Sequence, residues 1–162
     1  MSDIQYRAIG IIHSPFTDPT GAPIQPVAAN VAEGTVEVLP ELEAALQDLD
    51  GFSHLFLLYH FHRAGPFQPV VTPFLDQAMH GLFATRAAAR PNPIGLSVVE
   101  LLAVSGSVLR IRGIDVLDGT PLLDIKPYVP DFDSPCSCRT GWLAGRSSLT
   151  ATLRADSRFS GE

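Results

Sequence analysis

Two stretches of this sequence hold side chains suited to charged ligands between prolines that stiffen the backbone. The first, FATRAAARPNPIGLSVVELL at residues 83–102, places Arg86 and Arg90 just before a Pro-Asn-Pro corner. Pro91 and Pro93 disfavour the α region for the residues that precede them, so the corner is expected to be extended and stiff. Arginines projecting from such a frame suit a carboxylate or a phosphate, because a guanidinium pairs with either in bidentate fashion.

A second stretch, DGTPLLDIKPY at residues 118–128, also confines charged groups between prolines. It contains a turn, two carboxylates, the only lysine of the chain and a tyrosine. Because the prolines remove backbone freedom in advance, binding a ligand between them costs less conformational entropy. The stretch is therefore a candidate site, and a solvent-exposed hairpin with an Asp-Lys surface pair is the alternative.

Histidines and cysteines raise the question of a metal site. His60 and His62 lie on one face if their segment is a strand, and Cys136 and Cys138 offer two thiols. Nothing in the sequence shows that these loops meet, and the histidines equally suit ligand contacts or hydrogen bonds in the core. No metal is predicted, and a metal-dependent hydrolase built on these side chains is a competing hypothesis.

Composition narrows the class of protein. The chain has 162 residues, of which 46% are apolar, so it is expected to fold as one domain. It has no apolar run long enough to cross a membrane and no sign of an exported disulfide framework, so we expect a soluble, cytoplasmic protein. No two glycines stand two positions apart, which excludes the G-x-G-x-x-G cofactor loop.

The net charge of −6 argues against tight, unaided binding of a polyanion. The charge is uneven, however. Residues 83–114 hold four arginines and one acidic residue, a balance of +3, within this acidic chain. The arginine-rich stretch is therefore the one place where an anionic partner is expected.

The elements that must position these groups are mostly short strands. Strands are predicted at residues 6–14, 34–39 and 53–62, followed by two strands from Gly95 onward that are joined at Ser105-Gly106, with a further turn at Asp118-Gly119. Leucine spacing predicts a helix over residues 40–51, and a helical turn is expected around residues 74–81. Many short strands without βαβ alternation predict a mainly β fold, a small closed or nearly closed β-barrel with one or two short helices.

Four stretches together resemble one known family: IGIIHSPF, GFSHLFLLYHFH, FATRAAARPNPIGLSVVEL and LDGTPLLDIKPY. On these motifs the chain is identified as a member of the TsaA (YaeB-like) family of TrmO-type β-barrel methyltransferases, as a short form without the C-terminal domain of longer members. The resemblance covers roughly residues 5–143 and implies a barrel domain over residues 1–145 with a tail at 146–162. It implies S-adenosyl-L-methionine as the methyl donor, a homodimer with the donor near the subunit interface, and N6-methylation of N6-threonylcarbamoyladenosine in tRNA.

The resemblance also implies which residues form the donor pocket. They are Gln25, Pro26, Val27, His62, Arg63, Arg86, Arg112, Gly113, Asp118, Gly119, Asp124, Ile125, Lys126 and Pro127. Family members commonly carry an arginine just before the Gln-Pro pair, whereas this chain has Ile24 there. Arg86 is expected to pair with the carboxylate of the donor, and Asp118 or Asp124 to receive its ammonium group or ribose hydroxyls.

Roles toward the methyl acceptor are predicted for a second set of residues. Arg90 and Asn92 are expected to bind the substrate, and Lys126 to help orient an anionic acceptor. Asp124, Lys126 and Tyr128 are the predicted catalytic residues, with Tyr128 or Asp124 assisting proton removal from the nucleophilic nitrogen. The alternative function is a sensor or interaction module that binds the donor without methylating tRNA.

Overall fold

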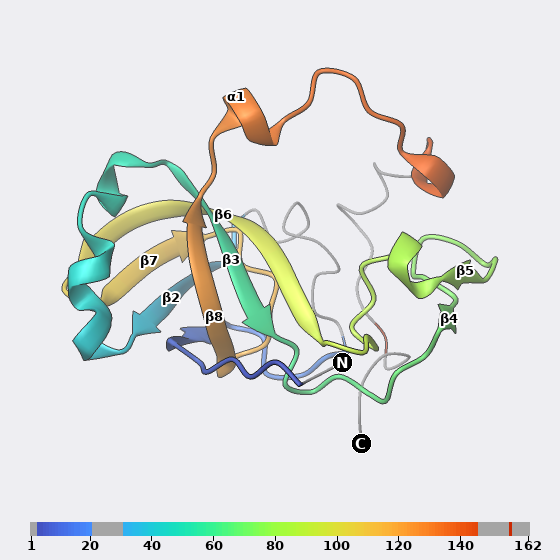
Figure 1. The fold of residues 1–162 in the computed structure, drawn as a ribbon, viewed down its shortest axis with the longest axis horizontal. Helices are drawn as coiled ribbons and strands as arrows, with labels where there is room; N and C mark the ends of the chain where they lie inside the picture. The colour runs from blue at the N-terminus through green and yellow to red at the C-terminus, as the bar shows by residue number, and fades with distance from the viewer. Residues whose placement is uncertain (1–2, 21–30, 146–155, 157–162) are drawn as a thin grey trace.

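The computed structural model describes residues 3–20, 31–145 and 156, and six strands among them form one closed β-barrel (Figure 1). Every neighbouring pair of strands is antiparallel, and the order around the barrel is β1-β2-β7-β6-β3-β8, with β8 pairing back onto β1. The strands are β1 (Gly10–His13), β2 (Glu33–Val38), β3 (His54–His60), β6 (Ile94–Ser105), β7 (Val108–Arg112) and β8 (Thr120–Pro127). The predicted mainly β barrel is confirmed.

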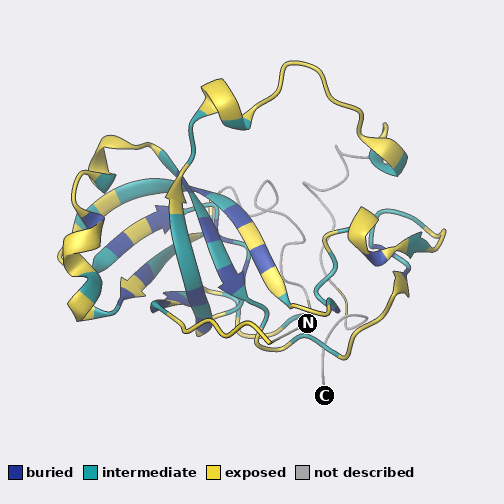
Figure 2. Cartoon of the chain, in the orientation of Figure 1, coloured by how far each residue is buried: buried dark blue, intermediate teal, exposed yellow. Residues whose placement is uncertain are grey.

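Buried side chains from all six strands fill the interior of the barrel. Figure 2 marks buried positions along the strands in dark blue. Along β3 the alternation places Leu55, Leu57 and Tyr59 inside and the residues between them outside, as period-two spacing predicts. Each fully buried aliphatic side chain contributes about 1.5–3 kcal/mol relative to exposure, so this packed interior is the main source of stability.

Two predicted turns are confirmed at strand ends, and the first of them closes the β6–β7 hairpin. Gly106 joins β6 to β7 and Gly119 precedes β8, and both adopt a positive φ, of 56° and 75° respectively. Residues with side chains rarely adopt this conformation, which explains the Ser-Gly and Asp-Gly pairs at these positions. In the part of the chain that the structure describes, no helix is long and apolar enough to span a membrane.

The helix predicted over residues 40–51 is wrong in type and extent. The segment forms two 3-10 turns, Pro40–Leu46 and Leu49–Gly51, separated by Asp48 in the left-handed region with φ of 63°. Leu46 is the only buried residue of the two turns, so the leucine spacing has no apolar surface long enough to support an α-helix.

A small two-stranded sheet lies to one side of the barrel. It consists of β4 (Val70–Val71) and β5 (His80–Gly81), followed by a 3-10 turn at Leu82–Ala84 (Figure 1). No helical turn forms around residues 74–81, because Asp76 Oδ1 accepts hydrogen bonds from the backbone of Gln77 and Ala78 and holds a tight loop instead. This excursion leads directly into the arginine-rich stretch.

The chain after β8 returns to this excursion. It forms α1 (Pro130–Asp133) and a 3-10 turn at Gly141–Leu143. Trp142 stacks on His80 with ring centroids 4.5 Å apart, and its Nε1 donates to the carbonyl oxygen of Ala84 at 2.8 Å. His80 in turn contacts Asp76 at 3.0 Å. These contacts fix the backbone two residues before Arg86.

Candidate functional site

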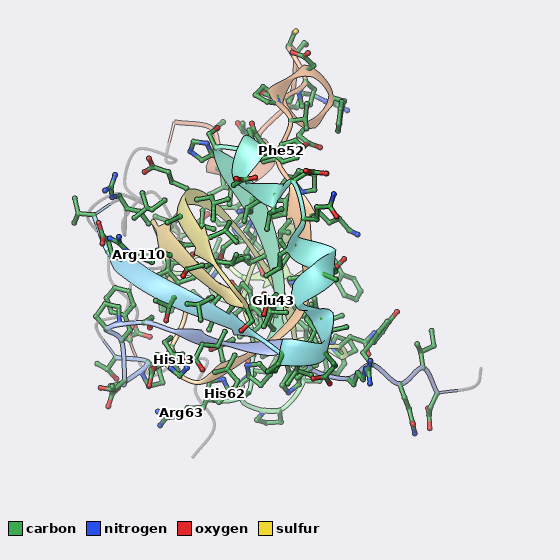
Figure 3. The ribbon with its side chains drawn as sticks, turned by 90° about the vertical axis from the view of Figure 1, so that its left-hand side faces the viewer. His13, Glu43, Phe52, His62, Arg63 and Arg110 are labelled. Atoms are coloured by element: carbon green, nitrogen blue, oxygen red, sulfur yellow. The ribbon has the colours of Figure 1, made fainter. Side chains whose placement is uncertain are left out.

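One end of the barrel gathers predicted donor residues from two separate segments, 62–63 and 118–119. Antiparallel pairing places the last residues of β1, β3 and β7 at the same end as the first residues of β2, β6 and β8, and we call this end the mouth. Figure 3 shows His13, His62 and Arg63 together at this end, and Phe52, which precedes β3, at the other. The mouth thus unites segments that are far apart in the sequence.

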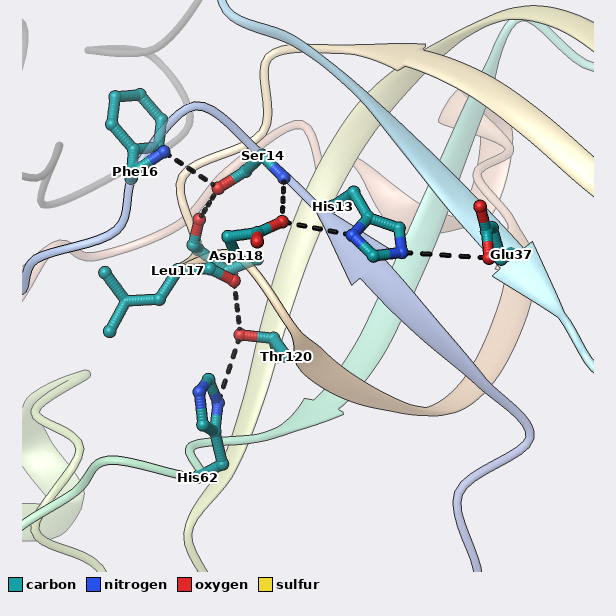
Figure 4. Close-up of polar contacts among 9 residues, drawn as sticks. His13, Ser14, Phe16, Glu37, His62, Leu117, Asp118 and Thr120 are labelled. Atoms are coloured by element: carbon teal, nitrogen blue, oxygen red, sulfur yellow. Dashed lines mark hydrogen bonds and ion pairs between the residues drawn. The ribbon is translucent and has the colours of Figure 1, made fainter.

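Asp118 is the acidic centre of the mouth (Figure 4). Its Oδ1 accepts a hydrogen bond from the backbone N–H of Ser14 at 3.2 Å and contacts His13 Nδ1 at 3.1 Å. The Ser14 N–H, followed by the contact with His13, holds the pKa of Asp118 below its ordinary value. Asp118 is therefore a carboxylate at neutral pH, and it is exposed enough to meet a cation or hydroxyl groups.

His62 faces this acidic centre through Thr120. The Thr120 hydroxyl donates to the carbonyl oxygen of Leu117 at 2.7 Å and lies 3.3 Å from His62 Nδ1. Burial, and then the positive charges of Arg63 and His60, lower the pKa of His62, so it is neutral at physiological pH. Because the Thr120 proton is already used, Nδ1 of His62 donates and Nε2 is left as an acceptor.

Arg63 and Gly119 complete the mouth. Nη1 of Arg63 donates to the carbonyl oxygen of Thr17 at 3.0 Å, which ties the end of β3 to the loop after β1. Gly119 sits between Asp118 and Thr120 in the turn that opens β8. Predicted donor residues from two separate segments, 62–63 and 118–119, are thus brought together.

A buried polar chain lies inside the barrel, and it was not predicted. The Tyr59 hydroxyl and Ser97 Oγ are 2.9 Å apart, and Ser97 Oγ donates to Asp115 Oδ1 at 2.5 Å. Burial raises the pKa of Asp115 to about 6, and burial also raises the pKa of Tyr59. The nearby charge of Arg86 opposes both shifts, which shows that Arg86 lies within electrostatic reach of this chain.

The predicted substrate residues belong to the stiff corner before β6. Arg90 Nη1 donates to the carbonyl oxygens of Thr85 at 3.0 Å and Ala87 at 3.4 Å, and its guanidinium lies 5.5 Å from the centre of the Phe83 ring. Asn92 is exposed, and its carbonyl oxygen accepts from the N–H of Ile94 at 2.7 Å. The corner fixes the arginine and connects directly to β6 at the mouth.

The predicted catalytic residues lie elsewhere, on the second half of β8. Asp124 is four residues beyond Thr120, about 13 Å along the strand at about 3.3 Å per residue. It forms an exposed ion pair with Lys126 at 2.7 Å, and Tyr128 packs edge-on against Phe56 at the end opposite the mouth. The structure does not bring Asp124, Ile125, Lys126, Pro127 and Tyr128 together with the mouth residues of the same barrel.

Arg112 and Gly113 lie at the mouth end of β7, where both are held by structural partners. Arg112 pairs with Glu33 at 3.2 Å and Glu100 at 3.1 Å, and Gly113 N–H donates to the carbonyl oxygen of Ala32 at 2.8 Å. The hydrogen bond from Arg112 and then that from Arg110 hold the pKa of Glu33 below its ordinary value. The predicted donor residues Gln25, Pro26 and Val27 lie outside the described residues.

The metal hypothesis gains no support from the geometry. Among residues 3–20, 31–145 and 156, no three or more His, Cys, Asp or Glu side chains gather as a metal site would require. His62 contacts Thr120, and the thiols of Cys136 and Cys138 are free and exposed.

Comparisons with known proteins identify the family. The model of the tRNA-methyltransferase O N-terminal domain matches residues 11–134. A probable S-adenosyl-L-methionine-binding protein of Pyrococcus abyssi is 56% identical over 156 residues, which cover 96% of this chain and 85% of that protein. The tRNA (adenine(37)-N6)-methyltransferase of Escherichia coli K12 is 40% identical over 144 residues, covering 83% of this chain and 61% of the relative.

Solved structures agree with this result. The crystal structure of TrmO from Pseudomonas aeruginosa matches with a TM-score of 0.73 and 43% identity, over 87% of this chain and 63% of that one. The chain thus spans less than two thirds of this structure and of the Escherichia coli enzyme. The family model matches residues 11–134, and the sequence motifs indicated the same family. The chain therefore belongs to the tRNA-methyltransferase O (TrmO) family.

Proposed function

We propose that this protein is an S-adenosyl-L-methionine-dependent methyltransferase that methylates N6 of N6-threonylcarbamoyladenosine at position 37 of tRNA. The observation that carries the proposal is the assembly of His62, Arg63, Asp118 and Gly119 at the mouth of a barrel of this family. Relatives named tRNA (adenine(37)-N6)-methyltransferases, including the one from Escherichia coli, support the choice of acceptor.

The groups at the mouth fit the methyl donor, which presents an ammonium group, ribose hydroxyls, a carboxylate and a sulfonium. Asp118 is ionised and suits the ammonium group or the ribose, while neutral His62 offers its Nε2 as an acceptor. Arg86 is the arginine that we assign to the carboxylate, because a guanidinium binds it through two parallel hydrogen bonds.

The chain's contribution to the reaction is alignment. A bound donor would supply an activated methyl group to the N6 nitrogen by one in-line displacement, in which the bond from sulfur to the methyl carbon breaks, the sulfur leaves as a neutral thioether and the nitrogen gives up its proton to solvent. The residues at the mouth hold the donor in one orientation, and the corner residues Arg90 and Asn92 position the acceptor. Asp124, Lys126 and Tyr128 are too far along β8 to serve the mouth of their own barrel, so their catalytic role is no part of this proposal.

We further propose that the protein is a homodimer. Antiparallel pairing of β3 with β6 joins five outward apolar side chains into one surface, which we call the outer face: Phe56, Leu58, Ile94, Leu96 and Val98. Leu58 is paired with Leu96, and Phe56 with Val98. A contiguous apolar surface of this kind typically marks an interface, and this one begins at the mouth, where a second subunit would border the donor site.

The working compartment proposed for the protein is the cytoplasm. The exposed, free thiols of Cys136 and Cys138 suit a reducing environment, in which disulfides are rare.

A second candidate function is donor binding without transfer. The Pyrococcus abyssi relative, which matches nearly the whole chain, is named only for its probable binding of S-adenosyl-L-methionine. Incubation with a labelled methyl donor and total tRNA, followed by nucleoside analysis, separates the two functions. Label in N6-threonylcarbamoyladenosine supports the methyltransferase, whereas tight donor binding without label in any RNA supports the sensor.

Replacement of Arg86 tests the donor site itself. Arg86→Ala should weaken donor binding by about 2–3 kcal/mol, the range for hydrogen bonds to charged groups, when measured by calorimetry. Arg110→Ala is the matched control, because Arg110 lies in an exposed ion pair with Glu33 on the barrel wall. The donor affinity of this variant should equal that of the wild type. Unaltered affinity in Arg86→Ala would remove this residue from the site.

A further inference from the structure

The excursion beside the barrel presents an exposed aromatic ring on a rigid turn. Phe83 is 78% exposed, whereas its neighbour Leu82 is buried and anchors the turn. Both the N–H and the hydroxyl of Thr85 donate to the carbonyl oxygen of Leu82, at 2.9 and 2.8 Å. The ring therefore projects from a backbone whose position is fixed on both sides, and the protein gains little stability from exposing it.

Arg90 lies over this ring and is itself held in place. Its guanidinium carbon is 5.5 Å from the ring centroid, and two backbone carbonyls accept its Nη1 protons. These bonds use part of the donor capacity of the guanidinium and leave its plane and its positive charge available. Phe83 and Arg90 together make up what we call the stacking platform.

The local charge selects the kind of ligand that fits. Residues 82–93 contain Arg86 and Arg90 and no acidic residue, in a chain with a net charge of −6. An aromatic ring beside a fixed guanidinium is the arrangement on which unpaired RNA bases stack, with the arginine also meeting the phosphates. A two-fold contact centred on Phe83 would instead bring positive charges of two copies together, so a second copy of this chain is disfavoured here.

We propose that Phe83 and Arg90 bind an unpaired base of the RNA substrate by stacking. This inference rests on the proposed function, and it adds a binding residue, Phe83, and a recognition mode to it. Phe83 lies three residues before Arg86 and Arg90 four residues after it, so a base stacked on the platform would border the residue that we assign to the methyl donor. Stacking does not depend on base identity, so the platform would hold the RNA loop while other contacts select the adenosine.

The test uses the whole chain and a synthetic anticodon stem-loop with N6-threonylcarbamoyladenosine at position 37 and 2-aminopurine placed at each other loop position in turn. One of these positions should lose fluorescence when the protein binds, because stacking quenches 2-aminopurine. Phe83→Ala should abolish that quenching and weaken RNA binding about tenfold, as expected for one stacked base. Phe83→Trp should retain both, and Phe83→Leu, which keeps the apolar contact without a π face, should behave like Phe83→Ala.

A matched control is available in Phe132, which is 75% exposed on α1. Phe132→Ala should change neither the quenching nor the affinity. The proposal is overturned if Phe83→Ala binds RNA like the wild type, or if light scattering shows that it loses a dimer, which would make Phe83 a subunit contact. Donor affinity, measured on the same variants, should stay constant. If the wild type transfers the methyl group and Phe83→Ala binds RNA normally, this inference alone is wrong. If the wild type binds no RNA, the proposed function is wrong as well.

Discussion

Asp115 shows how one side chain can be costly to the fold and still be kept. Asp115 is half-buried, and its carboxyl oxygen accepts a hydrogen bond from the Ser97 hydroxyl, whose oxygen also contacts the Tyr59 hydroxyl. An ionised carboxylate in such surroundings is disfavoured, which is why its pKa rises to about 6. Arg86, which we propose as a donor-binding residue, lies close enough to offset part of that cost, so its charge is electrostatically linked to the buried chain.

This linkage predicts a pH dependence of stability. The folded protein keeps the Asp115 proton up to about pH 6, whereas the unfolded chain releases it near 3.8, so stability falls as pH rises between these values. Asp115→Asn cannot ionise and avoids that loss. The difference in unfolding free energy, variant minus wild type, should therefore increase by about 2 kcal/mol from pH 4 to pH 7 in urea titrations.

Asp118→Asn supplies the opposite case. The folded-state pKa of Asp118 is lowered, so its stabilising contribution is present above the ordinary pKa and is lost as pH falls. Because the folded-state pKa lies below 3.8, the difference in unfolding free energy, variant minus wild type, should stay nearly constant from pH 4 to pH 7 and should rise as pH falls below about 4. A difference for Asp115→Asn that stays flat between pH 4 and 7 would contradict the assignment.

At the scale of elements, local pattern predicts the strands well and the site only in part. The alternation in β3 and the Ser-Gly turn between β6 and β7 are properties of neighbouring residues, and both are confirmed. The partnership of Tyr59 with Ser97 depends instead on the register of β3 against β6, in which Tyr59 is paired with Gly95. Register is set by the closed barrel as a whole, so no local pattern pointed to this buried chain.

The same pairing explains one glycine of the Pro-Asn-Pro corner motif. A Cβ added to Gly95 would lie 2.1 Å from a ring carbon of Tyr59, and that ring is buried with its hydroxyl bonded to Ser97. Gly95→Ala should therefore destabilise the protein by about 3 kcal/mol, as overpacking does in a rigid interior. Gly81→Ala is the control, because nothing lies within 4 Å of its added Cβ, and its effect should stay within about 0.5 kcal/mol. Equal urea midpoints for the two variants would refute the packing argument.

At the scale of the whole molecule, the barrel separates residues that the sequence places side by side. Asp118 and Tyr128 stand in one short stretch, which suggested a single site, but the extended strand β8 carries them to opposite ends. The closed barrel instead brings Asp118 into contact with His13, and Thr120 into contact with His62. In each pair the two residues are more than fifty positions apart in the sequence. Grouping by sequence distance works for turns and fails along strands.

The outer face gives the last prediction. Leu96 is 47% exposed at its centre, paired with Leu58 across β3 and β6. If two copies meet there, Leu96→Glu would bury a carboxylate in each half of the interface, and sedimentation should show a monomer where the wild type is a dimer. Val31→Glu is the control, since Val31 is 81% exposed in the loop before β2, and its mass should match that of the wild type. Because the outer face begins at the mouth, the Leu96→Glu monomer should also bind the donor less tightly than the wild type. If Leu96→Glu stays dimeric and its donor affinity is unchanged, this face is not the interface.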